Sequence, residues 1–498
     1  MKFILRRAPQ GLAVAVAILF TAVYFAAALP RLVYPYDLDF LEDSVLLEAV
    51  RFSNNQPVYI PPNAVFNPHV YMPLYFWLGG LLFRMAGPSL LLLRSVSLGA
   101  VLATIVAIYW ISKRESAQHW IAVTGAGLFL AGYAISGYWY ELARVDSLFV
   151  ALTVWGLALA VYAEGLTHRL ILSAVLLALA TFTKQTGFAV GASMAVFLLI
   201  TAGRRAGSFS LVFLVLTVVP ALLINKITSG WFFYHIFYIG TADPTEFGRL
   251  VSFVKDKIFG VMAGLSLAAI LAVILYVRRS GLRALLDQPW FAGITLAVVI
   301  SGLGRFRVGG NLNNLMPAYT LLCLSPGLLF HAAHLPPTDP RPEPSRWPFV
   351  EWLIAALALG QFALGAYLPA VHIPTAAMRR SGDELIHQIA SVDGPVLVMM
   401  HPYYAMLAGK EPSTQIATLW YVRHRGELPL PPDFVDRIKT QYYSEIISDG
   451  SSFETDTALQ TLLTTYYVPA QSLRYDQAPP TNTGVVVRPS LVYLPRQP

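Results

Sequence analysis

Residues 34–78 read YPYDLDFLEDSVLLEAVRFSNNQPVYIPPNAVFNPHVYMPLYFWL. This stretch carries five acids and one arginine, Arg51, although only 13% of the residues in the chain are charged. The acids are Asp37, Asp39, Glu42, Asp43 and Glu48. On a helix, Asp39 would share one face with Glu42 and Asp43, three and four residues further on. Like charges this close raise one another's pKa, which suits a carboxylate that accepts a proton; a solvated helix with ordinary surface acids is the plainer interpretation.

The composition of the whole chain is that of a polytopic membrane protein. Of 498 residues, 56% are hydrophobic, the mean hydropathy is +0.57, and the apolar residues form runs long enough to cross a bilayer. The single cysteine, Cys323, excludes a disulfide framework and a cysteine-based metal site. The net charge of +7 comes from short basic clusters between apolar runs, a topological pattern that does not indicate a nucleic-acid partner.

Eleven apolar runs are predicted to cross the membrane, the first as an uncleaved span: 11–30, 88–111, 119–138, 146–163, 169–183, 187–202, 208–227, 257–277, 289–304, 314–334 and 349–370. The segment 72–86 is short for a span of roughly 20 residues, which predicts an interfacial or re-entrant helix. With eleven crossings most basic clusters fall on one side, namely Lys2/Arg6/Arg7, Lys113/Arg114, Arg169, Arg204/Arg205, Arg278/Arg279/Arg283 and Arg341/Arg346. The positive-inside rule then places the N-terminus in the cytoplasm and the acidic stretch outside.

Two domains are predicted. Residues 1–370 form the transmembrane domain, with an outer loop at 31–87 and a proline-rich cytoplasmic connector at 335–348. Residues 371–498 contain four segments with strand character and are expected to form a small outer α/β domain. These segments are PVLVMM (395–400), SEIISDG (444–450), TTYYVP (464–469) and GVVVRPSLVYL (484–494).

Further polar groups collect at span ends on the predicted outer side. They are the turn Glu141–Asp146, the turn Thr183–Gln185, the break at 305–314 and the aromatic segments 67–77 and 231–238. Arginine and lysine can neutralise the oxygens of a lipid-linked phosphate, and an aspartate or glutamate can deprotonate an acceptor hydroxyl. Each group also has a purely structural interpretation: His69, for example, could be a ligand, a base or a loop hydrogen-bonding residue.

The order of these features resembles the GT-C membrane glycosyltransferases, which include the protein O-mannosyltransferases and the lipid A aminoarabinose transferase. In that group an Asp-Glu pair in the first outer loop precedes a Y-x-P-L-Y helix; here Glu42-Asp43 stands in reversed order before Tyr71-Met-Pro73-Leu-Tyr75. An A-R-x-D turn is matched by Ala143-Arg144-Val-Asp146, and a T-K turn by Thr183-Lys184. The resemblance covers roughly residues 10–330.

The resemblance implies a mainly α-helical, GT-C-like polytopic protein with about eleven transmembrane helices and an outer C-terminal α/β domain. It implies an inverting transferase that moves a sugar from a polyprenyl phosphate to an acceptor hydroxyl on a glycan, lipid or protein, on the outer side of a bacterial plasma membrane. Asp39, Glu42 and Asp43 are the candidate bases. Expected substrate-binding residues are Asp37, His69, Tyr71, Arg144, Asp146, Lys184, Arg305 or Arg307, and Asn314.

Three questions stay open at the level of sequence. Some relatives use a divalent cation near the acidic loop and others do not, so the acids here could bind Mg²⁺ or Mn²⁺, with no dedicated cage evident. A flippase for lipid-linked sugar is the main alternative function. A membrane scaffold that works through residues 371–498 is the second, although it leaves the clustered acids and cations without a use.

Overall fold

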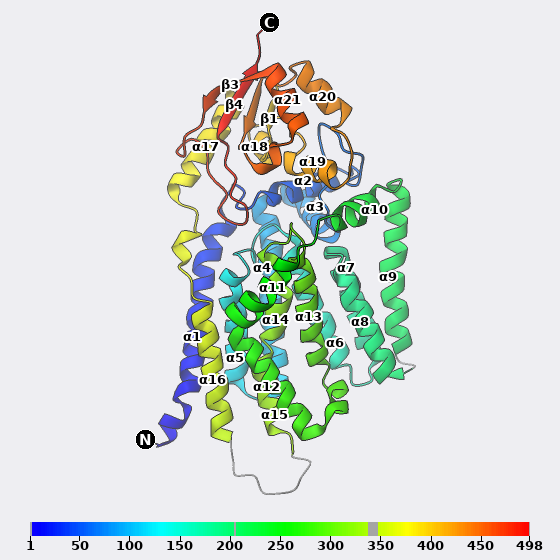
Figure 1. Cartoon of the computed structure of the whole chain (residues 1–498), viewed down its shortest axis with the longest axis vertical. Coiled ribbons are helices and arrows are strands. Elements are labelled where there is room, and N and C mark those ends of the chain that lie inside the picture. Colours follow the sequence, from blue (N-terminus) through cyan, green and yellow to red (C-terminus); the bar gives the residue numbers. More distant parts are fainter. Residues whose placement is uncertain (1, 204–205, 337–346, 498) are drawn as a thin grey trace.

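A computed structural model describes residues 2–203, 206–336 and 347–497. Helices form a tall bundle, and a small mixed domain covers the end of the bundle that lies farther from the N-terminus (Figure 1). The mainly helical architecture with a small C-terminal α/β part is thus confirmed. Most of the connector 335–348, Arg204/Arg205, Arg341/Arg346 and the side chains of Lys2, Arg6 and Arg7 lie outside the described residues.

Within the described residues, seven helical segments are long and apolar enough to cross a membrane. They comprise α1 (Lys2–Leu32), α4 (Leu90–Ser116), α9 (Ala206–Ile227), α12 (Ala263–Ser280), α13 (Pro289–Phe306), the pair α14 (Met316–Leu322) and α15 (Ser325–His334), and α16 (Trp347–Leu364). Shorter apolar helices are α3 (Leu74–Ala86), α5 (His119–Ile135), α6 (Val145–Val161), α7 (Thr167–Thr183) and α8 (Gly187–Thr201). The chain is an integral membrane protein with several transmembrane helices, and the number of eleven crossings stays a prediction.

Two of the predicted spans are less regular than expected. The run 314–334 is divided into α14 and α15, because Pro326 in the first turn of α15 has no N–H to continue the preceding helix. The run 257–277 begins inside the π-helical segment η3 (Phe253–Val261), and α12 starts only at Ala263. The aromatic segment 231–238 forms α10 (Trp231–Phe233) and part of the π-helix η2 (Tyr234–Ile239).

The first loop folds back on the bundle as two short helices, α2 (Leu41–Ser53) and α3. The short helix predicted at 72–86 is present as α3, and whether it lies at the membrane interface stays a prediction. α3 packs closely against α2, since a Cβ added at Gly80 would lie 2.8 Å from the carbonyl oxygen of Ala49. Only glycine allows this approach, which holds α2 across the end of the bundle beneath the C-terminal domain (Figure 1).

The C-terminal domain contains a four-stranded mixed sheet in the order β1-β2-β4-β3. β1 and β2 are parallel, and β4 is antiparallel to β2 and β3. Its strands are β1 (Val396–Val398), β2 (Glu445–Ser448), β3 (Tyr467–Ser472) and β4 (Leu491–Pro495), and its helices are α17 (Ala376–Ser391), α18 (Pro402–Leu407), α19 (Ile416–His424), α20 (Pro432–Lys439) and α21 (Thr457–Tyr466). All four predicted strand segments contribute, but the last does so only from Leu491 onward, since residues 484–490 form a loop.

The C-terminal domain closes over the first loop through backbone and side-chain hydrogen bonds. The amides of Asn482 and Thr483 both donate to the carbonyl of Leu38, at 3.1 and 2.9 Å. The side-chain amide of Gln415 donates to the carbonyl of Phe40 at 2.6 Å. The acidic stretch is therefore held between the helical bundle and a domain that begins more than 300 residues later in the chain.

Candidate active site

Glu42 lies in the first turn of α2 and is completely engaged by donors. The buried guanidinium of Arg94, on α4, binds it in bidentate fashion at 2.8 and 2.6 Å. The amides of Ala143 and Leu38 donate to the same two oxygens at 2.7 and 2.8 Å. Burial alone would raise the pKa of Glu42, but Arg94 and these amides hold it below its ordinary value. Glu42 thus stays ionised and fixes the loop.

Asp39 lies just before α2 and pairs with Arg144, whereas Glu42 pairs with Arg94. Its Oδ1 accepts from Arg144 at 2.8 Å and from the amide of Leu41 at 3.1 Å, while its Oδ2 accepts from the indole of Trp139 at 3.1 Å. Burial raises the pKa of Asp39, and Arg144 and Trp139 offset part of that rise. Because Asp39 is not on the helix, the predicted common face of Asp39, Glu42 and Asp43 does not form; each carboxylate points to its own partner.

Arg144 links the acidic loop to the start of α6. It donates from Nε to Asp146 at 3.3 Å and from Nη2 to the hydroxyl of Tyr71 at 2.7 Å. With Asp39 on Nη1, the guanidinium therefore joins two carboxylates and a phenol that come from three separate segments of the chain. Burial would lower the pKa of Arg144, but Tyr71, Asp39 and Asp146 raise it above its ordinary value, so it stays a cation.

Asp146 and Lys184 form the second half of this network. Lys184 Nζ, at the end of α7, donates to Asp146 at 2.8 Å and to the side-chain oxygen of Asn314 at 3.3 Å. Asn313 donates to both oxygens of Asp146 at 3.1 Å. The A-R-x-D turn, the T-K turn and the late polar break, predicted separately from the sequence, thus meet at one place. We call Asp39, Arg144, Asp146 and Lys184 the charge network.

A buried polar cluster of Glu48, Asn67 and His69 adjoins the charge network through Tyr71. The amide of His69 donates to Glu48 at 2.8 Å, and its ring lies 4.5 Å from that of Tyr71. Both ring nitrogens of His69, both side-chain polar atoms of Asn67 and one oxygen of Glu48 have no hydrogen-bond partner among the described residues. Burial lowers the pKa of His69 to about 3 and raises that of Glu48 to about 8, so both side chains are neutral near pH 7.

The two arginines of the late break bind backbone carbonyls and have no carboxylate partner among the described residues. Arg305 donates to the carbonyl of Gly310 at 2.6 Å, and Arg307 donates to that of Gly240 at 2.8 Å. Arg305 Nε is buried and unpartnered. Asn314 connects this break to the network, because it accepts from Lys184 and donates to the carbonyl of Gly304 at 3.5 Å.

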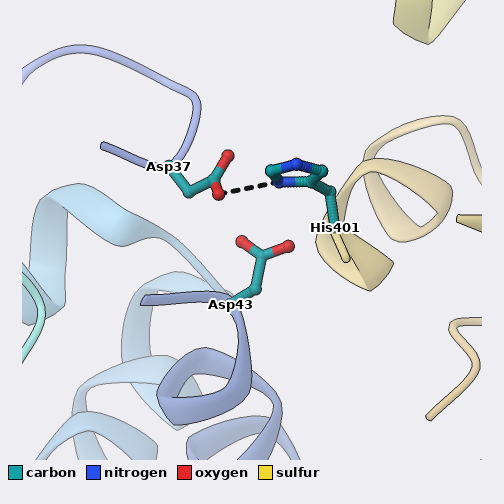
Figure 2. Close-up of side chains that lie close together, drawn as sticks. All are labelled: Asp37, Asp43 and His401. Atoms are coloured by element: carbon teal, nitrogen blue, oxygen red, sulfur yellow. Dashed lines mark hydrogen bonds and ion pairs between the residues drawn. The ribbon is translucent and has the colours of Figure 1, made fainter. Parts of the chain in front are cut away.

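Asp37 and Asp43 face the C-terminal domain. Asp37 accepts from the hydroxyl of Tyr404 and lies 2.8 Å from Nδ1 of His401; Asp43 accepts from the amide of Tyr403 at 3.2 Å. In Figure 2 both carboxylates point toward the imidazole of His401. One ligand atom from each of these three buried residues lies within 4.8 Å of the other two, so the group could hold a metal ion.

An apolar groove begins one helical turn from Asp146. Phe149 and Val150 on α6 line its upper part, which continues into a cavity of about 420 Å³ between α6, α8 and α13. Four lining residues are common to both parts: Leu157, Val190, Gly293 and Leu296. The first lining residues of this groove, Phe149 and Val150, thus lie about one helical turn along α6 from Asp146.

Sequence reasoning missed several residues that build the site. Arg31 forms a buried ion pair with Glu141 and donates to Thr483 at 2.9 Å, and Arg94 holds Glu42. The position of Arg94 within an apolar run is a sequence signal that could have identified it, because membrane spans rarely contain an unpaired charge. No comparable local signal marks His401, whose partners lie more than 300 residues away in the sequence.

Solved structures with the same fold are membrane glycosyltransferases. The chain is similar to ArnT from Cupriavidus metallidurans bound to undecaprenyl phosphate, with a TM-score of 0.60, 13% identity, and 97% of this chain and 98% of that chain covered. It is also similar to the apo oligosaccharyltransferase of Archaeoglobus fulgidus, with a TM-score of 0.53, 11% identity, and 94% and 73% covered. The fold is therefore that of the GT-C class, as the sequence resemblance predicts.

The sequence itself matches a family model over residues 67–231, described as dolichyl-phosphate-mannose-protein mannosyltransferase. No curated protein matches the chain. The matched segment includes Tyr71, Arg144, Asp146 and Lys184, which are four residues of the site described above. Together the family match and the fold identify the chain as a membrane glycosyltransferase of the GT-C kind.

Proposed function

We propose that this protein is an inverting transferase that moves a sugar from a polyprenyl-phosphate donor to an acceptor hydroxyl. One observation carries the proposal: on α6 the charge network at Asp146 is followed, about one helical turn further on, by the lining of an apolar groove between α6, α8 and α13. A polyprenyl-phosphate sugar has the same division, with a charged head on a long apolar chain. The ArnT structure with undecaprenyl phosphate supports this donor class, since it has the same fold.

The reaction takes place at the end of the bundle that carries the C-terminal domain, which we place outside the cytoplasm of a bacterial plasma membrane. α4 supports this orientation. Its Arg94 lies at the first loop, while Lys113 and Arg114 lie at its opposite end, where the positive-inside rule favours the cytoplasm.

Arg144 and Lys184 bind the phosphate of the donor, with Arg305 and Arg307 as further cations. As the bond between sugar and phosphate breaks, negative charge develops on the phosphate oxygens. Fixed cations in a buried site stabilise that charge more strongly than they would in water. Arg305 offers an unpartnered Nε for this purpose.

Asp39 is the general base that takes the proton of the acceptor hydroxyl. Of the three candidate bases, Asp39 is the one in contact with Arg144, so it lies next to the cation that binds the leaving phosphate. Glu42 fits the role less well because four donors occupy its oxygens. Asp43 has a free oxygen, but it lies toward His401 in the C-terminal domain. We therefore assign Glu42 a positioning role.

The buried polar cluster of Asn67, His69 and Glu48, next to Tyr71, binds hydroxyl groups of the substrates. Its unpartnered atoms would remain unsatisfied unless ligands or water filled them, and a sugar ring offers several matching donors and acceptors. The acceptor enters from the aqueous side, where it is a glycan, a lipid or a protein.

The charge network is neutral without a Mg²⁺ or Mn²⁺ ion, because the negative charges of Asp39 and Asp146 balance the positive charges of Arg144 and Lys184. Asp37, Asp43 and Glu48 lack such a cation among the described residues, and of these Asp37 and Asp43 lie together with a third possible ligand, His401. If a divalent ion binds to this loop, those two residues are the better ligands.

The test uses detergent-purified protein and a panel of radiolabelled polyprenyl-phosphate sugars. We expect one or more donors to release polyprenyl phosphate when an acceptor is added, and Lys184→Ala to weaken that reaction. Asp476→Asn, which changes an exposed carboxylate, should react like the wild type. Movement of an intact donor between the leaflets of liposomes, without its consumption, would favour a flippase and overturn the proposal.

A further inference from the structure

His401 lies between two carboxylates inside the contact of the first loop with the C-terminal domain. Its Nδ1 is 2.8 Å from Asp37, and its Nε2 is 2.8 Å from Asp449, with all three side chains fully buried. Asp43 lies on the Nδ1 side, with one oxygen within 4.8 Å of both Asp37 and the imidazole. The cluster thus contains three carboxylates and one imidazole.

Each ring nitrogen of His401 contacts a carboxylate. In the tautomer with the proton on Nε2, this N–H donates to Asp449 and the lone pair of Nδ1 is directed at Asp37 and Asp43. Metal-binding histidines commonly show this arrangement, in which a carboxylate accepts the second ring N–H and fixes the tautomer and orientation of the ring.

The charge of the cluster is not balanced by the chain. Even with a protonated imidazole, three carboxylates leave an excess of two negative charges, and no lysine or arginine pairs with these acids in the described part of the chain. Asp43 accepts one amide at 3.2 Å, and its other oxygen is buried without a partner. Burying an unpaired carboxylate is costly, whereas a divalent cation would remove both the excess charge and the missing contact.

The cluster is separate from the reaction centre. Asp39 contacts Arg144, whereas Asp37 contacts His401. The ligand atoms come from both sides of one contact: Asp37 and Asp43 from the first loop, and His401 from the C-terminal domain.

We propose that Asp37, Asp43 and His401 bind a divalent metal ion that fastens the C-terminal domain to the first loop. Two carboxylate oxygens and one imidazole nitrogen favour Mn²⁺ or Zn²⁺ over Mg²⁺ and Ca²⁺, which prefer oxygen ligands alone. Asp449 is a positioning residue that orients His401. The ion holds in place the stretch that carries Asp39 and takes no part in the sugar transfer.

The experiment measures metal content and thermal unfolding of the full-length protein in detergent. Protein stripped with a chelator is loaded with Mn²⁺ or Zn²⁺ alone, passed over a desalting column and analysed by mass spectrometry of the metal. We expect one ion per chain and a higher unfolding temperature. Asp43→Asn and His401→Gln should lose both effects, and Asp449→Asn should weaken binding about 10–100-fold.

Asp433→Asn is the matched control. Asp433 also joins the C-terminal domain to the first loop, since it accepts from the amide of Ala64 at 2.9 Å, but it lies outside the cluster. This variant should bind the ion like the wild type. Asp43→Asn is expected to fold, because asparagine keeps an acceptor for Tyr403 and removes an unpaired buried charge. Without metal it should therefore unfold at or above the temperature of the wild type.

Two results would overturn the proposal. The first is absence of a bound ion, or equal binding by Asp43→Asn and the wild type. The second is loss of the ion in Asp39→Asn together with its retention in Asp43→Asn, which would place the ion at the charge network. Neither result depends on whether a donor is consumed, so failure of this inference is distinguishable from failure of the proposed transferase.

Discussion

The acidic stretch supplies two regions that differ in how their charge is balanced. In the charge network, Asp39 and Asp146 pair with Arg144 and Lys184, and nearby Glu42 pairs with Arg94. In the cluster of Asp37, Asp43, His401 and Asp449, negative charge is in excess. Glu42 and Asp43 are neighbours in sequence, yet their surroundings are opposite. The partner that each carboxylate meets, more than its spacing from the next acid, therefore determines what it can do.

Loss of the buried ion pair between Arg94 and Glu42 should have the largest effect on stability. Arg94→Ala leaves Glu42 buried without its cation, and loss of one partner of a buried pair typically costs about 3–5 kcal/mol. Arg114→Ala breaks the exposed pair with Glu164 and should cost about 1 kcal/mol or less. Thermal unfolding of both variants in the same detergent measures the difference, and equal losses would show that Arg94 does not hold the loop.

Glu48 sharpens the comparison because it is a buried acid with no cationic partner in the part of the chain that the structure describes. Its pKa is about 8 in the folded protein against an ordinary value of 4.5, so between these two pH values the folded state holds a proton that the unfolded chain has lost. Stability contributed by this group therefore falls as the pH rises from 4.5 through 8, by a few kcal/mol at most.

Glu48→Gln removes this pH-dependent loss. The unfolding temperature of the variant, relative to that of the wild type, should increase from pH 5 to pH 9. Glu246→Gln, which changes an exposed glutamate, is the control and should show no such trend. A constant difference across this pH range would mean that Glu48 is ionised throughout.

A smaller effect is expected from the apolar groove between α6, α8 and α13. Gly293 lines both parts of the groove, and a Cβ there would meet Leu321 at 3.7 Å, an ordinary contact. Gly293→Ala should therefore be tolerated. Gly293→Phe should obstruct the groove and raise KM for the donor about tenfold, equivalent to about 1.4 kcal/mol. Equal KM values for the two variants in a titration of the donor would place the lipid chain elsewhere.

Local patterns in the sequence were sufficient to predict most helices of the bundle. The apolar runs predicted most of the helices, the length of 72–86 predicted the short α3, and the turns at Arg144 and Lys184 meet as their order predicted. These features depend on periodicity, composition and short motifs, which are properties of contiguous residues.

What the sequence could not predict depends on contacts between distant segments. The interpretation of Asp39, Glu42 and Asp43 as one helical face was wrong because α2 begins only at Leu41. The sequence left the role of residues 371–498 open; in the structure they contribute His401, and the loop at Gly484 closes on Asp39. A Cβ at Gly484 would lie 2.5 Å from Oδ2 of Asp39. No periodicity in either segment indicates that they meet.

The central claim is that Asp39 is the base of the charge network. A single-turnover assay with a reactive donor tests it most directly, with Asp39→Asn compared with Glu42→Gln and with metal-loaded wild type. The account predicts that Asp39→Asn slows transfer about 10²–10⁴-fold while donor affinity is nearly unchanged, because only the proton acceptor is lost. A variant Asp39→Asn that transfers sugar at the rate of the wild type would contradict the account.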